Sequence, residues 1–185
     1  MNILICGDIV GRSGREIIYE KIPVLKKENN IDFIVVNGEN AASGFGITKK
    51  ICEQLYEVGV DVITTGNHVW DQKEILNYIN TDSRLLRPIN YSNHSPGKGL
   101  GIYICSNGIH VAVINVMCNL FMESLNSPFE KLDNAIEEIN SKIENKITIV
   151  DVHGEATSEK MAIGHYLDGK VSAVVGTHTH VPTSD

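Results

Sequence analysis

Seven potential metal ligands stand out because almost every one of them follows directly after a short apolar run. They offer only oxygen and nitrogen donor atoms and are Asp8, Glu39, Asn40, Asn67, His153, His178 and His180. Carboxylate, amide and imidazole groups together suit hard-to-borderline divalent metals, and a pair of such ions can activate water for hydrolysis. The set therefore predicts a dinuclear metal hydrolase.

Taken singly, these residues are weaker signals. A structural role for Asp8, as a helix N-cap or a turn residue, explains it as well as metal binding does. A lone Gly38-Glu39-Asn40 is most often a turn. The strongest local element is His178-Thr179-His180, because two histidines so close together in a loop can converge on neighbouring metals. It is the agreement of five sites along the chain that favours metal binding.

The apolar runs indicate the elements that must position these groups. They are short and rich in Val and Ile, and they alternate with helical patterns, which is typical of buried parallel strands. The runs before the ligands cover about residues 3–7, 34–38, 62–66, 147–152 and 171–177. Ligands of open α/β sheets bind beyond the carboxyl ends of the strands, so five strand ends would bring the seven groups to one edge.

Helices are predicted between these strands. Ser13 and Glu16 have the spacing of a capping box that begins a helix, as do Ser127 and Glu130, and further helical patterns cover 48–58 and 70–79. The middle of the chain differs. Segments 101–105 and 109–116 flank Ser106-Asn107-Gly108, a strong signal for an antiparallel hairpin.

Composition narrows the class of protein. The 185 residues are 42% hydrophobic, enough for one substantial core, and the formal charge of −7 without a basic stripe argues against stable nucleic-acid binding. No apolar stretch approaches the roughly 18 residues of a membrane span. The start of the chain lacks the pattern of a signal peptide, and the four cysteines lack a C-x-x-C spacing. We expect a cytoplasmic protein that does not bind membranes.

The ligand pattern resembles that of the calcineurin-like metallophosphoesterases, whose blocks read Asp-x-His, Gly-Asp-x-x-Asp, Gly-Asn-His-Asp/Glu, His and Gly-His-x-His. The matching segments are Asp8-Ile9-Val10, Asn37-Gly38-Glu39-Asn40, Gly66-Asn67-His68-Val69, His153 and Gly176-Thr177-His178-Thr179-His180. Val10 stands where a histidine is usual, Glu39 replaces the bridging aspartate, and Asn40 is available to fill the place left at position 10. With these variants the chain resembles the bacterial YmdB-like branch, which contains 2′,3′-cyclic-nucleotide 2′-phosphodiesterases.

The resemblance implies roles for these residues. Asp8, Asn40 and His180 would hold one divalent transition metal, Asn67, His153 and His178 a second, and Glu39 would bridge the two; Fe or Mn is expected. Hydroxide activated by the metals would attack phosphorus in line, and His68 would protonate the departing sugar oxygen as general acid. The substrate would be a 2′,3′-cyclic nucleotide or another phosphodiester, and the product the 3′-nucleotide. Asp151 and Glu155 could each orient a metal-bound imidazole, although a surface or capping role explains Asp151 equally well.

The implied fold is a four-layer α/β/β/α metallophosphoesterase sandwich, forming a single domain over residues 1–185. Members of the branch continue past the last histidine block, whereas this sequence ends at Asp185. We therefore expect the domain to lack its C-terminal strands, which would leave the inner face of the 101–116 hairpin exposed and favour self-association into a homo-oligomer.

Two other functions compete with this interpretation. A dinucleotide-binding domain is disfavoured because Gly7, Gly11 and Gly14 do not have G-x-G-x-x-G spacing and Asp8 would repel a pyrophosphate. A non-catalytic regulator that binds metal and nucleotide is the alternative that stays open, and turnover of a phosphodiester distinguishes it from an enzyme.

Overall fold

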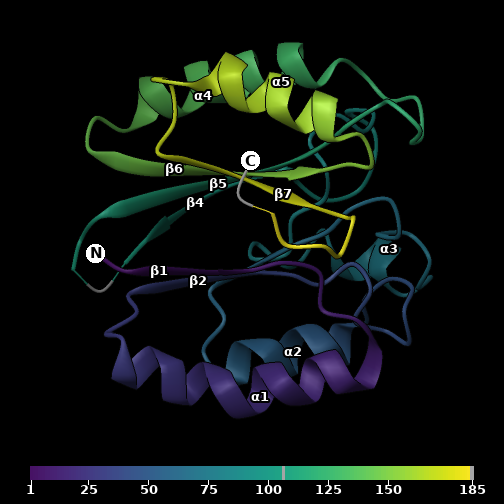
Figure 1. The fold of residues 1–185 in the computed structure, drawn as a ribbon, viewed down its shortest axis with the longest axis vertical. Helices are drawn as coiled ribbons and strands as arrows, with labels where there is room; N and C mark the ends of the chain where they lie inside the picture. The colour runs from purple at the N-terminus through teal and green to yellow at the C-terminus, as the bar shows by residue number, and fades with distance from the viewer. Residues whose placement is uncertain (106, 184–185) are drawn as a thin grey trace.

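Two β-sheets lie face to face between two pairs of helices (Figure 1). The computed structural model describes residues 1–105 and 107–183. The first sheet has the order β1-β2-β3, formed by Ile3–Cys6, Phe33–Asn37 and Val62–Thr64. The second has the order β4-β5-β6-β7, formed by Leu100–Ile104, His110–Met117, Lys146–His153 and Ala173–Thr177. Helices α1 (Gly11–Glu28) and α2 (Lys49–Glu57) cover the first sheet, and α4 (Pro128–Lys142) and α5 (Thr157–Leu167) cover the second. The four-layer α/β/β/α architecture is confirmed.

Parallel pairing gives both sheets a common direction. Strands β1, β2 and β3 are parallel, as are β5, β6 and β7, while β4 pairs with β5 in the antiparallel sense. Strands β2, β3 and β5 are buried at nearly every position, because a helix layer covers one face of each and the other sheet covers the opposite face. The register places Met117 beside His153 and His153 beside Thr177, so polar side chains begin where the strands end.

The core between the sheets overturns the expectation of an exposed hairpin face at β5, whereas β4 is only partly buried. Val111 and Val113 of β5 are fully buried and pack with Phe33, Val35 and Ile149. Alternate residues of β5 point the other way, into the core beneath α4 and α5. The second sheet is therefore covered on both faces at β5. Of the predicted hairpin turn, Ser106 lies outside the described residues, and Gly108 has the expected positive φ of 81°.

Two helices have other bounds in the structure than the sequence predicts. The pattern over 70–79 forms a helix only at α3 (Ile75–Tyr78), because residues 66–71 make turns in which Val69 N–H donates to Gly66 O and Asp71 N–H donates to His68 O. Helix α1 begins at Gly11 rather than at Ser13, and no side chain caps its first turn. Gly11 has a φ of +56°, and its N–H donates to Asn40 O at 2.9 Å. The Ser127 cap of α4 is as predicted. None of the described helices is long and apolar enough to cross a membrane.

Candidate metal centre

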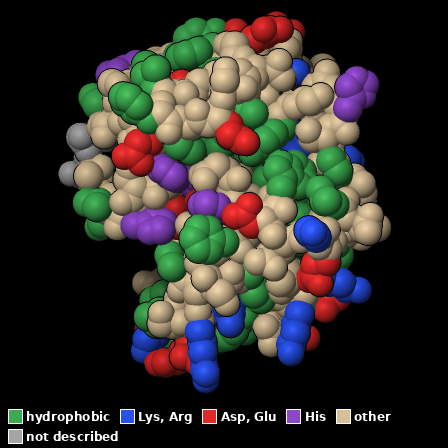
Figure 2. All heavy atoms as spheres, turned by 90° about the vertical axis from the view of Figure 1, so that its right-hand side faces the viewer, with side chains coloured by type: hydrophobic (Ala, Val, Ile, Leu, Met, Phe, Trp, Pro, Cys, Tyr) green, Lys and Arg blue, Asp and Glu red, His purple; other side chains and the backbone are tan. Residues whose placement is uncertain are grey.

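The structure brings all seven predicted ligands to the edge where the parallel strands end. Figure 2 views this edge and shows histidine side chains near the middle of the face, with acidic and hydrophobic side chains beside them. Asp8 follows β1, Glu39 and Asn40 follow β2, Asn67 follows β3, His153 ends β6, and His178 and His180 follow β7. This is the position that parallel α/β sheets use for ligands. On the α5 side, the group borders a cavity of about 1370 Å³ that Asp8, Glu155, His178 and His180 help to line.

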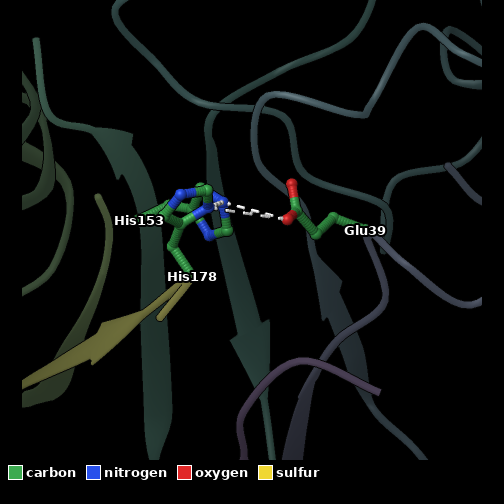
Figure 3. A group of neighbouring side chains, drawn as sticks. All are labelled: Glu39, His153 and His178. Atoms are coloured by element: carbon green, nitrogen blue, oxygen red, sulfur yellow. Dashed lines mark hydrogen bonds and ion pairs between the residues drawn. The ribbon is translucent and has the colours of Figure 1, made fainter. Parts of the chain in front are cut away.

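Glu39 lies at the centre of the group and is fully buried. Its Oε1 is 3.0 Å from Asn40 Nδ2 and 3.1 Å from His153 Nε2, and its Oε2 accepts a hydrogen bond from the His68 N–H at 3.2 Å. Figure 3 shows the carboxylate facing the rings of His153 and His178. Burial alone would raise the pKa of Glu39, but the hydrogen bond and charge of His153 outweigh burial and lower it. The site thus stabilises a negative charge on Glu39.

On one side of Glu39 lie Asp8, Asn40 and His180. The Oδ2 of Asp8 is 3.0 Å from His180 Nε2 and accepts a hydrogen bond from the His178 backbone N–H, also at 3.0 Å. His180 Nε2 is in turn 3.2 Å from Asn40 Nδ2. These three side chains converge, as the resemblance implies for the first metal.

On the other side lie Asn67, His153 and His178. His153 Nε2 is 3.1 Å from Asn67 Oδ1 and 3.1 Å from His178 Nδ1. The second ring nitrogen of His178 faces Glu155 Oε2 at 3.1 Å. Glu155 therefore contacts a histidine of the predicted set, although that histidine is His178 rather than His153.

The loop after β7 allows its two histidines to serve different halves of the group. His178 has a φ of 91° and His180 a φ of 54°, both in the left-handed region that residues with side chains rarely adopt. This backbone conformation directs the side chain of His178 toward His153 and that of His180 toward Asp8. Non-glycine residues in this conformation are costly, and such strain is concentrated at functional sites.

Three observations indicate that the converging side chains could bind a metal ion. Among the described residues, Asp8 Oδ1 is buried without a hydrogen-bond partner, and burial raises the pKa of this carboxyl. Donor atoms of Glu39, His153 and His178 lie within 4.8 Å of one another. Neighbouring donors about 3 Å apart match the spacing of adjacent ligands around an ion with bonds of about 2.1 Å. A cation would therefore satisfy Asp8 and take up donors that already converge.

Gly66 keeps the centre of this group open. A Cβ added there would lie 2.2 Å from His153 Nε2 and 2.3 Å from Glu39 Oε2. The φ of Gly66 is not in the left-handed region. Glycine is therefore required here only because the neighbouring side chains leave no room for a Cβ.

A buried network that the sequence did not reveal supports His153. The Nδ1–H of His153 donates to Thr177 Oγ1 at 2.9 Å, and the Thr177 hydroxyl donates to Asp151 Oδ1 at 2.7 Å. Thr64 and Asn37 donate to the other oxygen of Asp151 at 2.5 and 3.0 Å. Asp151 is thus a buried positioning residue rather than a surface charge. The one available signal for Thr177 was its position directly before His178 at the end of a strand.

His68 stands apart from the converging donors. Its ring Nδ1 donates to Asp71 Oδ2 at 2.8 Å, which leaves Nε2 as the nitrogen available to a substrate. Its side chain is 27% exposed, while its backbone N–H is bound to Glu39. The imidazole is thereby held beside the candidate metal ligands without being one of them.

The fold and this site define the class of protein, an α/β/β/α metallophosphoesterase-like domain. Solved structures of the same fold include a hypothetical protein from Thermus thermophilus, with a TM-score of 0.91 and 40% identity over 100% of this chain and 70% of that one. A protein described as a novel phosphatase from Mycoplasma pneumoniae has a TM-score of 0.89 and 34% identity over 99% of this chain and 66% of that one.

The chain belongs to the YmdB-like family, since the family model described as YmdB-like protein matches residues 4–185. A 2′,3′-cyclic-nucleotide 2′-phosphodiesterase of Bacillus subtilis (strain 168) is 47% identical over 185 residues, which are 100% of this chain and 69% of that protein.

Proposed function

We propose that this chain is a dinuclear metal-dependent phosphodiesterase that hydrolyses 2′,3′-cyclic nucleotides to 3′-nucleotides. The observation that carries the proposal is the position of Glu39 between two groups of converging donors, with His68 held beside them. The name of the Bacillus subtilis relative supports the substrate class. The free cysteines favour a reducing compartment, and we expect the protein to act in the cytoplasm.

Two divalent metals, Fe or Mn, would be held by Asp8, Asn40 and His180 on one side and by Asn67, His153 and His178 on the other, with Glu39 shared. When bound, such ions lower the pKa of a coordinated water and neutralise the charge of a phosphoryl group. Only Asp8 and Glu39 among the seven ligands carry negative charge when the histidines are neutral. Two divalent cations would leave the site positive, which favours an anionic phosphodiester.

His68 would act on the leaving group. Its Nδ1 is held by Asp71, so its Nε2 is free to donate a proton to the sugar O2′ as the P–O2′ bond breaks. The phosphate then remains on O3′, and the product is the 3′-monophosphate. A water oxygen forms the new bond to phosphorus, so the overall step consumes one water.

The experiment is a comparison of His68→Ala with His94→Ala, because His94 is an exposed histidine outside the site. His68→Ala should lower kcat on a 2′,3′-cyclic nucleotide by roughly 10²–10⁴-fold while both metals remain bound, since it removes a proton donor and no ligand. His94→Ala should leave kcat unchanged. The defect of His68→Ala should be smaller with an aryl leaving group, which needs little protonation.

Metal content provides an independent test. Elemental analysis of protein purified without chelators should give close to two transition-metal ions per chain, and Glu39→Ala or Asn67→Ala should lower that value together with the rate. A folded protein that binds no metal even after Mn²⁺ or Fe²⁺ is added would contradict the proposal. Two bound metals without turnover of any phosphodiester would favour the alternative, a non-catalytic regulator that binds metal and nucleotide.

A further inference from the structure

An exposed aromatic ring lies directly beside His68. The ring centroids of Phe45 and His68 are 5.0 Å apart, and their planes meet at 80°. Phe45 is nevertheless 58% exposed, so most of its surface remains open to solvent. Leaving an apolar ring in water is unfavourable, and the contact with His68 does not bury it. This surface is therefore available to an apolar or aromatic part of a ligand.

The backbone around Phe45 is held on both sides. Its carbonyl accepts a hydrogen bond from Gln72 Nε2 at 2.8 Å, and its N–H donates to Ala42 O at 3.1 Å. The next residue, Gly46, has a φ of +74°, and a Cβ there would lie 2.9 Å from Gln72 Cγ and 3.1 Å from His68 O. The loop that carries Glu39 and Asn40 thus packs closely against the segment of His68, and Phe45 is positioned before a ligand arrives.

We propose that Phe45 is the residue against which the base of the nucleotide stacks, an inference that rests on the proposed function. If His68 protonates O2′, then it lies at the C2′ atom of the ribose. The base is attached to C1′, the neighbouring carbon. An aromatic ring in contact with His68 is therefore next to the point where the base leaves the sugar.

The position of Phe45 beside His68 also bears on whether the P–O2′ or the P–O3′ bond of the cyclic phosphate breaks. If O3′ were the leaving atom, C3′ would be at His68, and the base would begin one carbon farther from Phe45. Stacking on Phe45 thus favours departure of O2′ over O3′. Because every base has a π-face, stacking tolerates all four bases, and we expect purines to bind more tightly than pyrimidines.

The experiment compares Phe45→Ala and Phe45→Trp on two substrates, a 2′,3′-cyclic adenosine phosphate and a methyl riboside 2,3-cyclic phosphate that has no base. Phe45→Ala should raise KM for the adenosine substrate about tenfold or more with kcat nearly unchanged, because it removes binding made equally in ground and transition states. KM for the riboside should not change. Phe45→Trp should restore the KM for the nucleotide.

Phe121→Ala is the matched control, because Phe121 is 88% exposed on a different loop, between β5 and α4. It should leave both KM values unchanged. Calorimetry provides a second readout: Phe45→Ala should weaken binding of adenosine 3′-monophosphate but not that of methyl riboside 3-phosphate.

Three outcomes would overturn the role of Phe45. One is an equal loss of kcat on both substrates, which would mean that Phe45 only positions His68. Another is an unchanged KM for the nucleotide in Phe45→Ala. The third is a rise in KM in Phe121→Ala as large as that in Phe45→Ala. In each case the wild-type chain still cleaves cyclic phosphates, whereas failure of the proposed function would appear as a wild-type chain that cleaves neither substrate.

Discussion

At the scale of single residues, the orientation of His153 depends on one hydroxyl group. Thr177 accepts a hydrogen bond from His153 Nδ1 and donates one to Asp151, which fixes the proton on Nδ1 and directs Nε2 toward Glu39. Asp151 is fully buried, and burial raises its pKa, although hydrogen bonds from Thr64, Thr177 and Asn37 act in the opposite direction. A partner of this kind fixes the tautomer of a metal-binding imidazole.

Thr177→Val therefore tests the network with little change of shape. It should weaken metal binding about 10–100-fold, because the imidazole loses its oriented partner. Titration of the metal-free protein with Mn²⁺ measures this change. Thr148→Val is the control, since Thr148 is also a buried threonine of the second sheet but lies nearer the start of β6. Equal metal affinities in the two variants would show that the Thr177 hydroxyl does not support the site.

At the scale of elements, the site is built by loops that follow strands, and these loops approach one another closely. The clearest example is the segment after β3, where Gly66 passes against His153 and Glu39 without space for a methyl group. The same segment continues into the turns that hold Asn67 and His68. These turns leave only α3 of the helix predicted over 70–79.

We predict that Gly66→Ala abolishes binding of metal at this site, because its Cβ would displace His153 or Glu39. Gly164→Ala, in the interior of α5, is the control: a Cβ there meets nothing within 4 Å and should stabilise the helix by about 0.5–1 kcal/mol. Elemental analysis measures the metal content of both variants, and thermal unfolding measures their stability. Full metal content in Gly66→Ala would contradict the geometry.

At the scale of the whole molecule, the contact between the two sheets joins the halves of the site. Phe33 and Val35 of the first sheet pack with Val111, Val113 and Ile149 of the second. This core lies between β2, which leads to Glu39, and β6, which ends at His153. Stability of the inter-sheet core and assembly of the ligands are therefore coupled.

Ile149→Ala should lower the free energy of unfolding by about 2–5 kcal/mol, since Ile149 is almost completely buried between the sheets. Ile104→Ala should change it by less than about 0.5 kcal/mol, because Ile104 is 69% exposed on β4. Urea denaturation measures both. Hydrogen exchange should show protection over 111–117 as strong as over 33–37, and weak protection at β5 would argue against the packing of the two sheets.

Much of the site could be predicted from the sequence alone. The seven donors follow apolar runs, and parallel strands carry their carboxyl ends to one edge, so position along the chain determines position in space. The convergence of Asp8, Glu39 and His153 follows from this local rule. The family and the four layers were implied instead by the resemblance of the ligand blocks to those of the YmdB-like branch.

Other features were decided only by tertiary structure. The hydrogen bond between Asn37 and Asp151 joins residues 114 positions apart, and no local pattern specifies such a pair. The burial of the hairpin face depends on the opposite sheet, and the contact of Phe45 with His68 depends on two loops from different strands. In these cases the favourable energy comes from groups distant in sequence, whose meeting depends on how the whole chain packs.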